Sequence, residues 1–406
     1  MAVVFAGVLT FYSAKWGFAN AISSRADFVE VSAWAAQLAP SDPQTRYANA
    51  VLLNATFDPA DAAKAVDEFQ AATALSPNNF LLWLELGRAF GSQGNSEKSI
   101  AALRRALELA PNYALTQWVL GNALLREGET TESAELIVRS AESEPRFSDP
   151  AANAIWQMAS GDIAAAESFL ASSPKVRSKL IPILLREKKF DDAIRTWNGL
   201  EPNPSKNELV DIGRAVYNQL IEAKRYRDAL AVISAISPNP LSVHSSGKLI
   251  NGGFEERGQP EFKTAFDWRF ADGAESRIGL SEGQKRTGSF SLLLGFPANA
   301  AAFRNVSQLA AAEPGATYSF EIFYRSELDT KASLKWEIVN AADGKRIAVT
   351  EPVVRTSEWT RLWAEFMMPE SADGVEIRII SECPIGACKF SGNIWFDDAS
   401  VNRITK

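Results

Sequence analysis

Few residues of this chain could perform catalytic chemistry. The 406 residues include one histidine, His244, and two cysteines. His244 lies in the Pro- and Ser-rich stretch Ser237–Gly247, which is typical of a linker. A Ser-His-Asp or Cys-His unit would have to use that histidine, and a zinc site would need more His and Cys ligands than the chain has. We therefore expect a non-enzymatic protein.

The two cysteines enclose a short segment between two predicted strands. Cys383 and Cys388 are separated by Pro384-Ile385-Gly386-Ala387, and the hairpin around them would bring them close together. Their spacing, without further ligands, does not suit a metal. The sequence therefore predicts a disulfide between Cys383 and Cys388, and with it an oxidising compartment.

Composition limits the possible partners. A net charge of −7 and no basic cluster argue against a nucleic-acid ligand, because phosphate binding needs a clustered positive surface. The length suggests two or three domains, and a hydrophobic content of 46% is ample for real cores.

Residues 1–22 are apolar except for Lys15. Three interpretations remain open: a transmembrane anchor with Lys15 near the interface, a signal peptide with Ala19-Asn20-Ala21 before the cleavage point, or a soluble capping helix. We favour the anchor. It predicts a single-pass protein of the bacterial inner membrane with periplasmic domains, attached to the membrane through this N-terminal helix.

Two consecutive copies of a 34-residue unit extend from Phe80 to Pro145. The first contains Trp83, Leu86, Gly87, Phe90, Ser99, Leu103, Ala106 and Pro111. The second contains Gln117, Leu120, Gly121, Leu124, Ser133, Ile137, Ser140 and Pro145. The pattern resembles the tetratricopeptide repeat (TPR) family, and weaker copies surround it. The resemblance implies an all-α solenoid of about six helical hairpins over residues 23–238.

Such repeats usually bind a peptide or protein in a groove formed by the first helix of each hairpin. The corresponding residues here are Leu81, Leu84, Arg88, Leu115, Trp118, Asn122 and Leu125. Leu84 and Arg88 replace the Lys and Asn of the family's clamp for C-terminal carboxylates, so we do not expect that ligand. We predict a protein partner in this groove. The alternative is that the neighbouring hairpin or the N-terminal helix buries Leu84 and Trp118.

After a linker at 239–247, the periodicity changes to that of strands. Ser319–Tyr324, Ser333–Ile338 and Val375–Ile380 alternate apolar and polar residues. Eight or nine short strands favour a β-sandwich over 248–406. The opening Leu249–Glu255 and the closing Gly392–Val401 resemble the first and last strands of the galactose-binding-like jelly rolls, a family that includes many carbohydrate-binding modules. The predicted fold class is thus multidomain α + β: a membrane helix, a TPR solenoid and a jelly roll.

The jelly-roll resemblance implies two kinds of site. One is a structural Ca²⁺ held by Glu255 and Asp397, with Asp398 as a substitute. The other is a polysaccharide ligand stacked on aromatic rings, for which the candidates are Trp336, Tyr324, Arg325, Phe303 and Arg304. Trp268, Trp359, Trp363 and Trp395 fall in recurrent motif positions, so we expect them in the core.

Together these features suggest a membrane-anchored envelope scaffold that binds a protein and a glycan, with a possible role in the assembly or export of a surface polysaccharide. The alternatives are a purely structural protein-interaction scaffold without sugar binding, and an accessory subunit of a carbohydrate-active enzyme.

Overall fold

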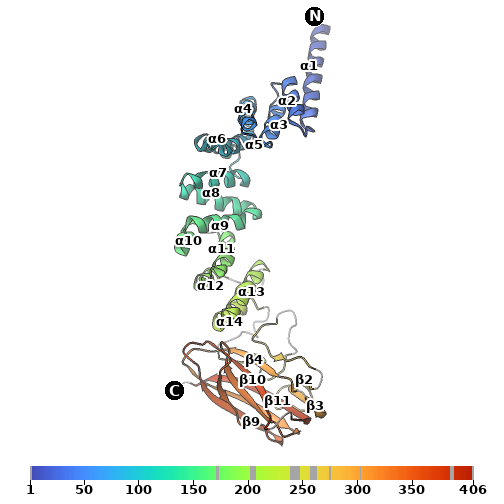
Figure 1. The fold of residues 1–406 in the computed structure, drawn as a ribbon, viewed down its shortest axis with the longest axis vertical. Coiled ribbons are helices and arrows are strands. Elements are labelled where there is room, and N and C mark those ends of the chain that lie inside the picture. The colour runs from blue at the N-terminus through green and yellow to red at the C-terminus, as the bar shows by residue number, and fades with distance from the viewer. Residues whose placement is uncertain are drawn as a thin grey trace. The chain divides into compact units, whose positions relative to one another are not determined.

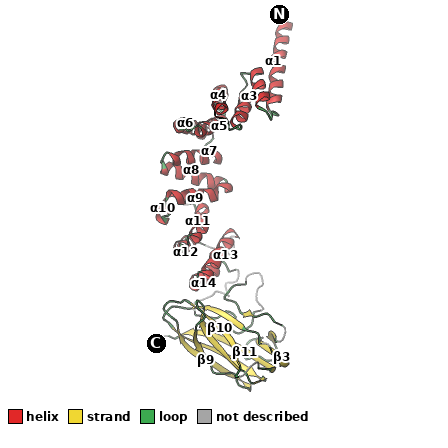
Figure 2. Ribbon diagram, viewed as in Figure 1, coloured by secondary structure: helices red, strands yellow, loops and turns green. Residues whose placement is uncertain are grey.

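The computed structural model describes residues 2–170, 173–201, 207–237, 247–256, 263–273, 276–301, 303–384 and 388–404. Helices precede strands along the chain (Figures 1 and 2). The chain forms two compact units, Met1–Ile183 and Leu184–Lys406. The last helices therefore belong to the same unit as the β-sandwich. The predicted linker at 239–247 lies almost entirely outside the described residues, and His244 lies wholly outside them.

Consecutive helices make up the first unit. They are α1 (Ala2–Ser23), α2 (Val29–Leu38), α3 (Pro43–Asn54), α4 (Pro59–Leu75), α5 (Phe80–Ser92), α6 (Ser96–Leu109), α7 (Ala114–Arg126), α8 (Thr130–Ser143), α9 (Ser148–Met158), α10 (Ile163–Leu170) and the greater part of α11 (Pro174–Arg186), with the 3₁₀ turn η1 (Pro145–Phe147) before α9. Asp42, Asp58, Asn79 and Asn95 cap α3 to α6 by accepting backbone N–H groups.

The two copies of the 34-residue unit form α5–α6 and α7–α8 and repeat the same contacts. Gly87 and Gly121 allow the paired helices to approach closely: a Cβ at Gly121 would lie 2.8 Å from Ile137 Cγ1. Ser99 Oγ donates to the Gly87 carbonyl at 2.7 Å, and Ser133 Oγ donates to the Gly121 carbonyl at 2.8 Å. These contacts confirm the predicted repeat.

Trp83 and Gln117 occupy equivalent positions in the two copies, and each donates a hydrogen bond to the carbonyl of a preceding proline. Trp83 Nε1 donates to the Pro77 carbonyl at 2.8 Å, and Gln117 Nε2 donates to the Pro111 carbonyl at 2.7 Å. Both bonds close the turn that leads into the first helix of the copy. The amide can replace the indole because each provides an N–H donor.

The N-terminal helix α1 is largely uncovered. Of its residues 6–23, only Ala19 and Ser23 are buried, whereas Phe11, Tyr12 and Phe18 are more than half exposed. Among the described residues, no helix is both long and apolar enough to cross a membrane.

The second unit contains α12 (Phe190–Asn198), α13 (Asn207–Glu222) and α14 (Tyr226–Ala235), followed by a two-sheet sandwich. One sheet has the order β1 (Arg269–Phe270), β4 (Val306–Ala311), β10 (Gly374–Glu382), β7 (Ser333–Asn340), β8 (Arg346–Val349). The other has the order β2 (Arg277–Ser281), β3 (Ser291–Ala300), β11 (Phe390–Arg403), β5 (Thr317–Ser326), β9 (Thr356–Met367), with β6 (Asp329–Thr330) paired to β11. All pairings are antiparallel.

The predicted strands at 319–324, 333–338 and 375–380 are confirmed within β5, β7 and β10. The predicted opening strand at Leu249–Glu255 is wrong. Asn251 and Phe254 have positive φ angles of 49° and 58°, and the Asn251 side chain bonds to the backbone of Glu256. These features make the segment a turn, which cannot pair as a strand.

Candidate functional site

A cavity of about 590 Å³ opens between the edges of the two sheets. Its walls come from the turn at 250–256, the segment at 263–270, strand β2 and the neighbouring part of β3. The lining residues are Ile250, Asn251, Phe254, Glu256, Lys263, Asp267, Trp268, Phe270, Ile278, Gly279, Leu280, Leu292 and Arg304. Since β1 and β2 are the terminal strands of their sheets, the cavity lies where the sandwich is open at its side.

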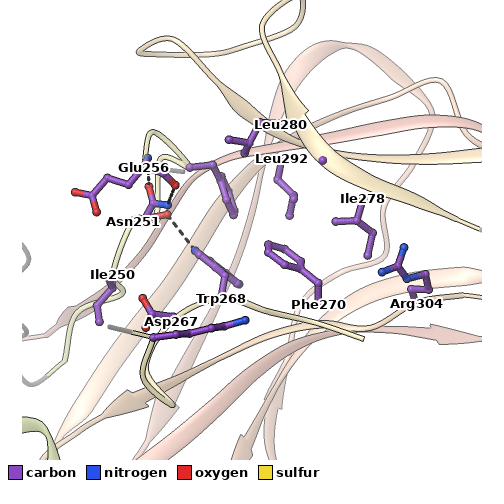
Figure 3. A pocket seen from close by; sticks show the side chains of 13 residues that line it. Ile250, Asn251, Glu256, Asp267, Trp268, Phe270, Ile278, Leu280, Leu292 and Arg304 are labelled. Atoms are coloured by element: carbon purple, nitrogen blue, oxygen red, sulfur yellow. Dashed lines mark hydrogen bonds between the residues drawn. The ribbon is translucent and has the colours of Figure 1, made fainter. Parts of the chain in front are cut away.

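The floor of the cavity is apolar. Phe270 faces Ile278 and Leu292 across the cavity, with Leu280 beside them (Figure 3). Phe270 is 42% exposed and Leu280 37%, whereas Trp268 is 6% exposed and packs its ring 5.1 Å from Phe254. The accessible surface at the floor is thus a phenyl ring and aliphatic side chains on a buried aromatic base.

Charged and polar side chains surround this floor. Asp267 Oδ2 accepts the backbone N–H and the hydroxyl of Thr264, at 2.6 and 2.9 Å. Arg304 donates to the carbonyls of Ala271 and Ser276, at 2.7 and 2.9 Å. Glu256 and Arg304 lie at opposite sides of the cavity (Figure 3), and the exposed Lys263 is the fourth charged side chain of the lining, with Asp267.

The two walls of the cavity are joined by hydrogen bonds. Trp268 Nε1 donates to the Asn251 carbonyl at 3.0 Å. The buried Gln308 amide donates to both Ile250 and Phe266 carbonyls, at 2.9 and 2.8 Å. The cavity is therefore preformed. It suits a ligand with one apolar face and several hydroxyl groups, because the face can lie on Phe270 while hydroxyls reach the charged side chains.

The residues predicted to bind sugar are mostly elsewhere. Trp336 and Tyr324 are 0% and 1% exposed, so the prediction that they contact a ligand is wrong. Trp336 packs against Trp268, Phe320 and Phe396 between the sheets. Arg325 is half-buried beside Glu327, and Phe303 stacks on Phe296. Of the five candidates, only Arg304 lines the cavity.

Of the four tryptophans expected in the core, two are buried, one is partly buried and one is exposed. Trp268 and Trp395 are each 6% exposed, and Trp359 is partly buried. Trp363, however, is 52% exposed on β9, because it points away from the core side chains Leu362 and Ala364.

The acidic residues predicted to hold Ca²⁺ converge on one loop but are bonded to donors. Asp397 is buried and accepts the N–H groups of Arg286, Thr287 and Asp398. Glu255 accepts those of Ser289 and Phe290. Asp398 accepts from the Thr287 hydroxyl and the Arg286 guanidinium. Oxygens aimed at N–H groups are not aimed at a cation, so this arrangement does not fit the metal.

In this acidic cluster, the pKa of the Asp397 carboxyl is shifted. Burial raises the pKa of Asp397 above its ordinary value, and the charge of Asp398 adds to the rise, although the N–H bonds oppose it. In the described part of the chain, no three His, Cys, Asp or Glu side chains are grouped as metal ligands.

The predicted groove residues of the helical repeats divide into two groups. Leu84 is fully buried against the neighbouring hairpin in a cluster with Leu103 and Leu120, so its assignment to the groove is wrong and the alternative of burial holds for it. Leu81 is 43% exposed, and Arg88 is exposed and paired with Glu85 at 3.0 Å.

The second copy contributes half-buried groove residues. Trp118 stacks on Phe147 at 5.2 Å between ring centroids, and Asn122 donates to the Trp118 carbonyl. Leu115 and Leu125 are also half-buried.

The predicted disulfide is confirmed: Cys383 and Cys388 are joined, with Cα atoms 5.8 Å apart.

Phe270, Leu280 and Asp267 line the cavity but were not among the residues predicted to bind sugar. A usable signal was present, since Trp268 and Phe270 stand two residues apart in a run rich in aromatic residues. What the sequence does not show is that β1 and β2 end their sheets, which is what leaves Phe270 and Leu280 exposed.

Comparison with known proteins identifies the helical repeats. Residues 47–114 and 84–152 match the family model "Tetratricopeptide repeat". No curated protein matches the chain. Among solved structures, the MamA protein from Desulfovibrio magneticus RS-1 (residues 41 to the end) is 19% identical and covers 41% of this chain and 94% of its own, with a TM-score of 0.34.

The sandwich also has structural matches. A CBM4 structure is 16% identical and covers 38% of this chain and 99% of its own, with a TM-score of 0.29. The CBM22-1-GH10 modules of the Clostridium thermocellum xylanase 10B, complexed with xylohexaose, are 15% identical and cover 39% of this chain and 29% of their own, with a TM-score of 0.27.

Proposed function

We propose that this chain is a non-enzymatic binding protein whose sandwich holds a glycan in the cavity at Phe270 and whose TPR region holds a protein partner. The observation that supports glycan binding most is the partly exposed phenyl ring of Phe270 in a polar-rimmed cavity. A pyranose has one face of C–H groups that can stack on such a ring.

The polar groups of the cavity support binding rather than catalysis. Two carboxylates, Glu256 and Asp267, line it, and glycoside hydrolysis also uses a carboxylate pair. Asp267, however, already accepts two hydrogen bonds from Thr264 through the same oxygen, which fits a role in holding the wall.

Titration of the full chain with a panel of oligosaccharides tests the glycan proposal. Phe270→Ala removes the stacking ring and should weaken binding about tenfold, equivalent to about 1.4 kcal/mol. Phe57→Ala is the matched control, because Phe57 is 93% exposed on the α3–α4 turn, in the first compact unit. Equal affinity of Phe270→Ala and the wild type, or no binding by the wild type, would refute the proposal. The second result would favour a purely structural scaffold.

The helical repeats offer partly exposed apolar side chains to a protein partner. Leu81 and Tyr113 are 43% and 39% exposed, and the second copy adds the half-buried Trp118. A pull-down with the full chain should lose its partner on Leu81→Glu and keep it on Phe270→Ala. Retention by Leu81→Glu would contradict a groove at this position.

We also propose that α1 holds the protein at a membrane, in an oxidising compartment such as the bacterial periplasm. Its exposed apolar residues include Val8, Leu9, Phe11, Tyr12, Trp16 and Phe18, and an apolar surface of this kind favours contact with lipid. The Cys383–Cys388 disulfide supports the compartment. The full chain should sediment with phosphatidylglycerol vesicles, and Phe11→Glu should reduce that fraction. A role in surface polysaccharide assembly or export would unite these properties.

A further inference from the structure

One wall of the cavity contacts helix α13. Tyr217 of α13 is 8% exposed, and its hydroxyl accepts the backbone N–H of Ala265 at 2.6 Å. Its ring lies 6.4 Å from that of Phe266. Ala265 and Phe266 directly precede Asp267 and Trp268, which line the cavity. A helix of the repeat region thus touches the segment that shapes the glycan site.

Tyr217 is buried at this contact, and its hydroxyl lies near the negative charge of Asp267. Burial raises the pKa of the Tyr217 hydroxyl, and the negative charge of Asp267 adds to the rise, while the bond from Ala265 opposes it. The hydroxyl is therefore neutral at physiological pH, and it lies close enough to the wall for the charge of Asp267 to affect its pKa.

The wall has two kinds of support. Gln308 of the sandwich holds its Phe266 carbonyl, as described above, and Thr264 closes a turn on Asp267. The Ala265 N–H lies between these points and is bonded to the helix. Without the Tyr217 hydroxyl, this partly buried N–H loses its one hydrogen-bond partner among the residues that the structure describes, and an unpaired donor favours a changed backbone conformation.

The helical hairpin that carries Tyr217 is itself fixed to the sandwich. The Asp373 carboxylate accepts the N–H groups of Tyr226 and Arg227, both at 3.1 Å, and the Tyr226 hydroxyl donates to the Ala341 carbonyl at 2.9 Å. A Cβ at Gly374 would lie only 2.4 Å from the Tyr226 ring. A wall bonded to α13 is therefore bonded to an element with a defined position.

We infer that Tyr217 is a positioning residue of the cavity, so that the last helical hairpin belongs to the glycan site although it touches no ligand. This inference rests on the proposed glycan binding. Tyr217 sets the backbone of residues 264–266 and through it the places of Asp267 and Trp268. Affinity for glycan then depends on the hairpin, and the sandwich separated from it should bind more weakly.

The test is Tyr217→Phe in the full chain, which keeps the ring and removes the acceptor. Hydrogen exchange in the peptide 263–268 should become faster, and affinity for the best oligosaccharide should fall about three- to tenfold. Tyr47→Phe, at a partly buried tyrosine of α3 in the first compact unit, is the control and should change neither. The unfolding temperature reports separately on any general loss of structure.

The outcomes separate this inference from the proposed function. Unchanged exchange in 263–268, or faster exchange with unchanged affinity, would overturn the role of Tyr217 while glycan binding stands. Faster exchange in a chain that binds no glycan would support Tyr217 as the residue that holds the wall and would refute only the glycan assignment.

Discussion

Helix α14 is capped by a residue of the sandwich, and removing that cap is a sharp test of the junction. Arg225, the residue before the helix, supplies no side-chain cap. Asp373, which is 147 positions away from Tyr226 in the chain, accepts the N–H groups of Tyr226 and Arg227 instead. Asp373→Ala leaves both donors without their partner.

The expected loss follows from these two bonds. Replacing a capping Asp by Ala costs about 0.5–2 kcal/mol, and the favourable interaction of a carboxylate with the helix dipole contributes about 0.3–1 kcal/mol of similar origin. Because these terms overlap, we expect the free energy of unfolding of the second unit to fall by about 1–2 kcal/mol. Asp373→Asn keeps an acceptor and loses only the charge, so its effect should be smaller.

The assay combines denaturant unfolding with hydrogen exchange. Far-UV ellipticity and tryptophan fluorescence follow unfolding of the whole chain, since both the helices and the sandwich contain tryptophans, and exchange of residues 226–229 reports on the first turn of α14. Asp272→Ala, at an exposed loop position of the sandwich, is the control. If the first turn of α14 exchanges at the wild-type rate in Asp373→Ala, the cap is absent in solution and the reasoning fails.

Three further predictions concern the repeats and the acidic cluster. Gly121→Ala should destabilise the repeats by up to about 2 kcal/mol, since overpacking against Ile137 (about 1–3 kcal/mol) exceeds the gain in helix propensity of about 1 kcal/mol; a more stable variant by thermal unfolding would contradict this. The pKa of Asp397 in the folded protein is raised above 3.8, so the stability of the wild type relative to Asp397→Asn should be greatest below pH 3.8 and should fall as pH rises through the folded pKa. Melting curves at several pH values measure this difference. A difference that instead grows with pH would show that the N–H bonds to the carboxylate dominate. Calcium should leave the unfolding temperature unchanged relative to chelator, whereas binding at a hundredfold excess over Kd would add about 2.7 kcal/mol and restore the predicted metal site.

The architecture was largely predictable because it rests on local periodicity. The 34-residue spacing identifies paired helices, and alternation identifies β5, β7 and β10. The same alternation could have shown that Trp336 is a core residue and not a ligand contact. Trp336 shares a face of its strand with Leu334 and Ile338, and all three are buried. Its aromatic character favoured a ligand role, but the period of two already placed it in the core.

The cavity was not predictable because it depends on which strands end the sheets. Strand order follows from pairings between distant segments, and no local pattern reveals that β1 and β2 are terminal. Terminal strands leave one side of the sandwich open, and open edges are usually covered by other elements. Here the turn at 250–256 and the segment at 263–268, bonded to α13 through Tyr217, border this side and leave the space above Phe270 accessible. The segment at 263–268 therefore borders the cavity and also contacts α13, which is how Tyr217 comes to lie behind a wall of the sandwich site.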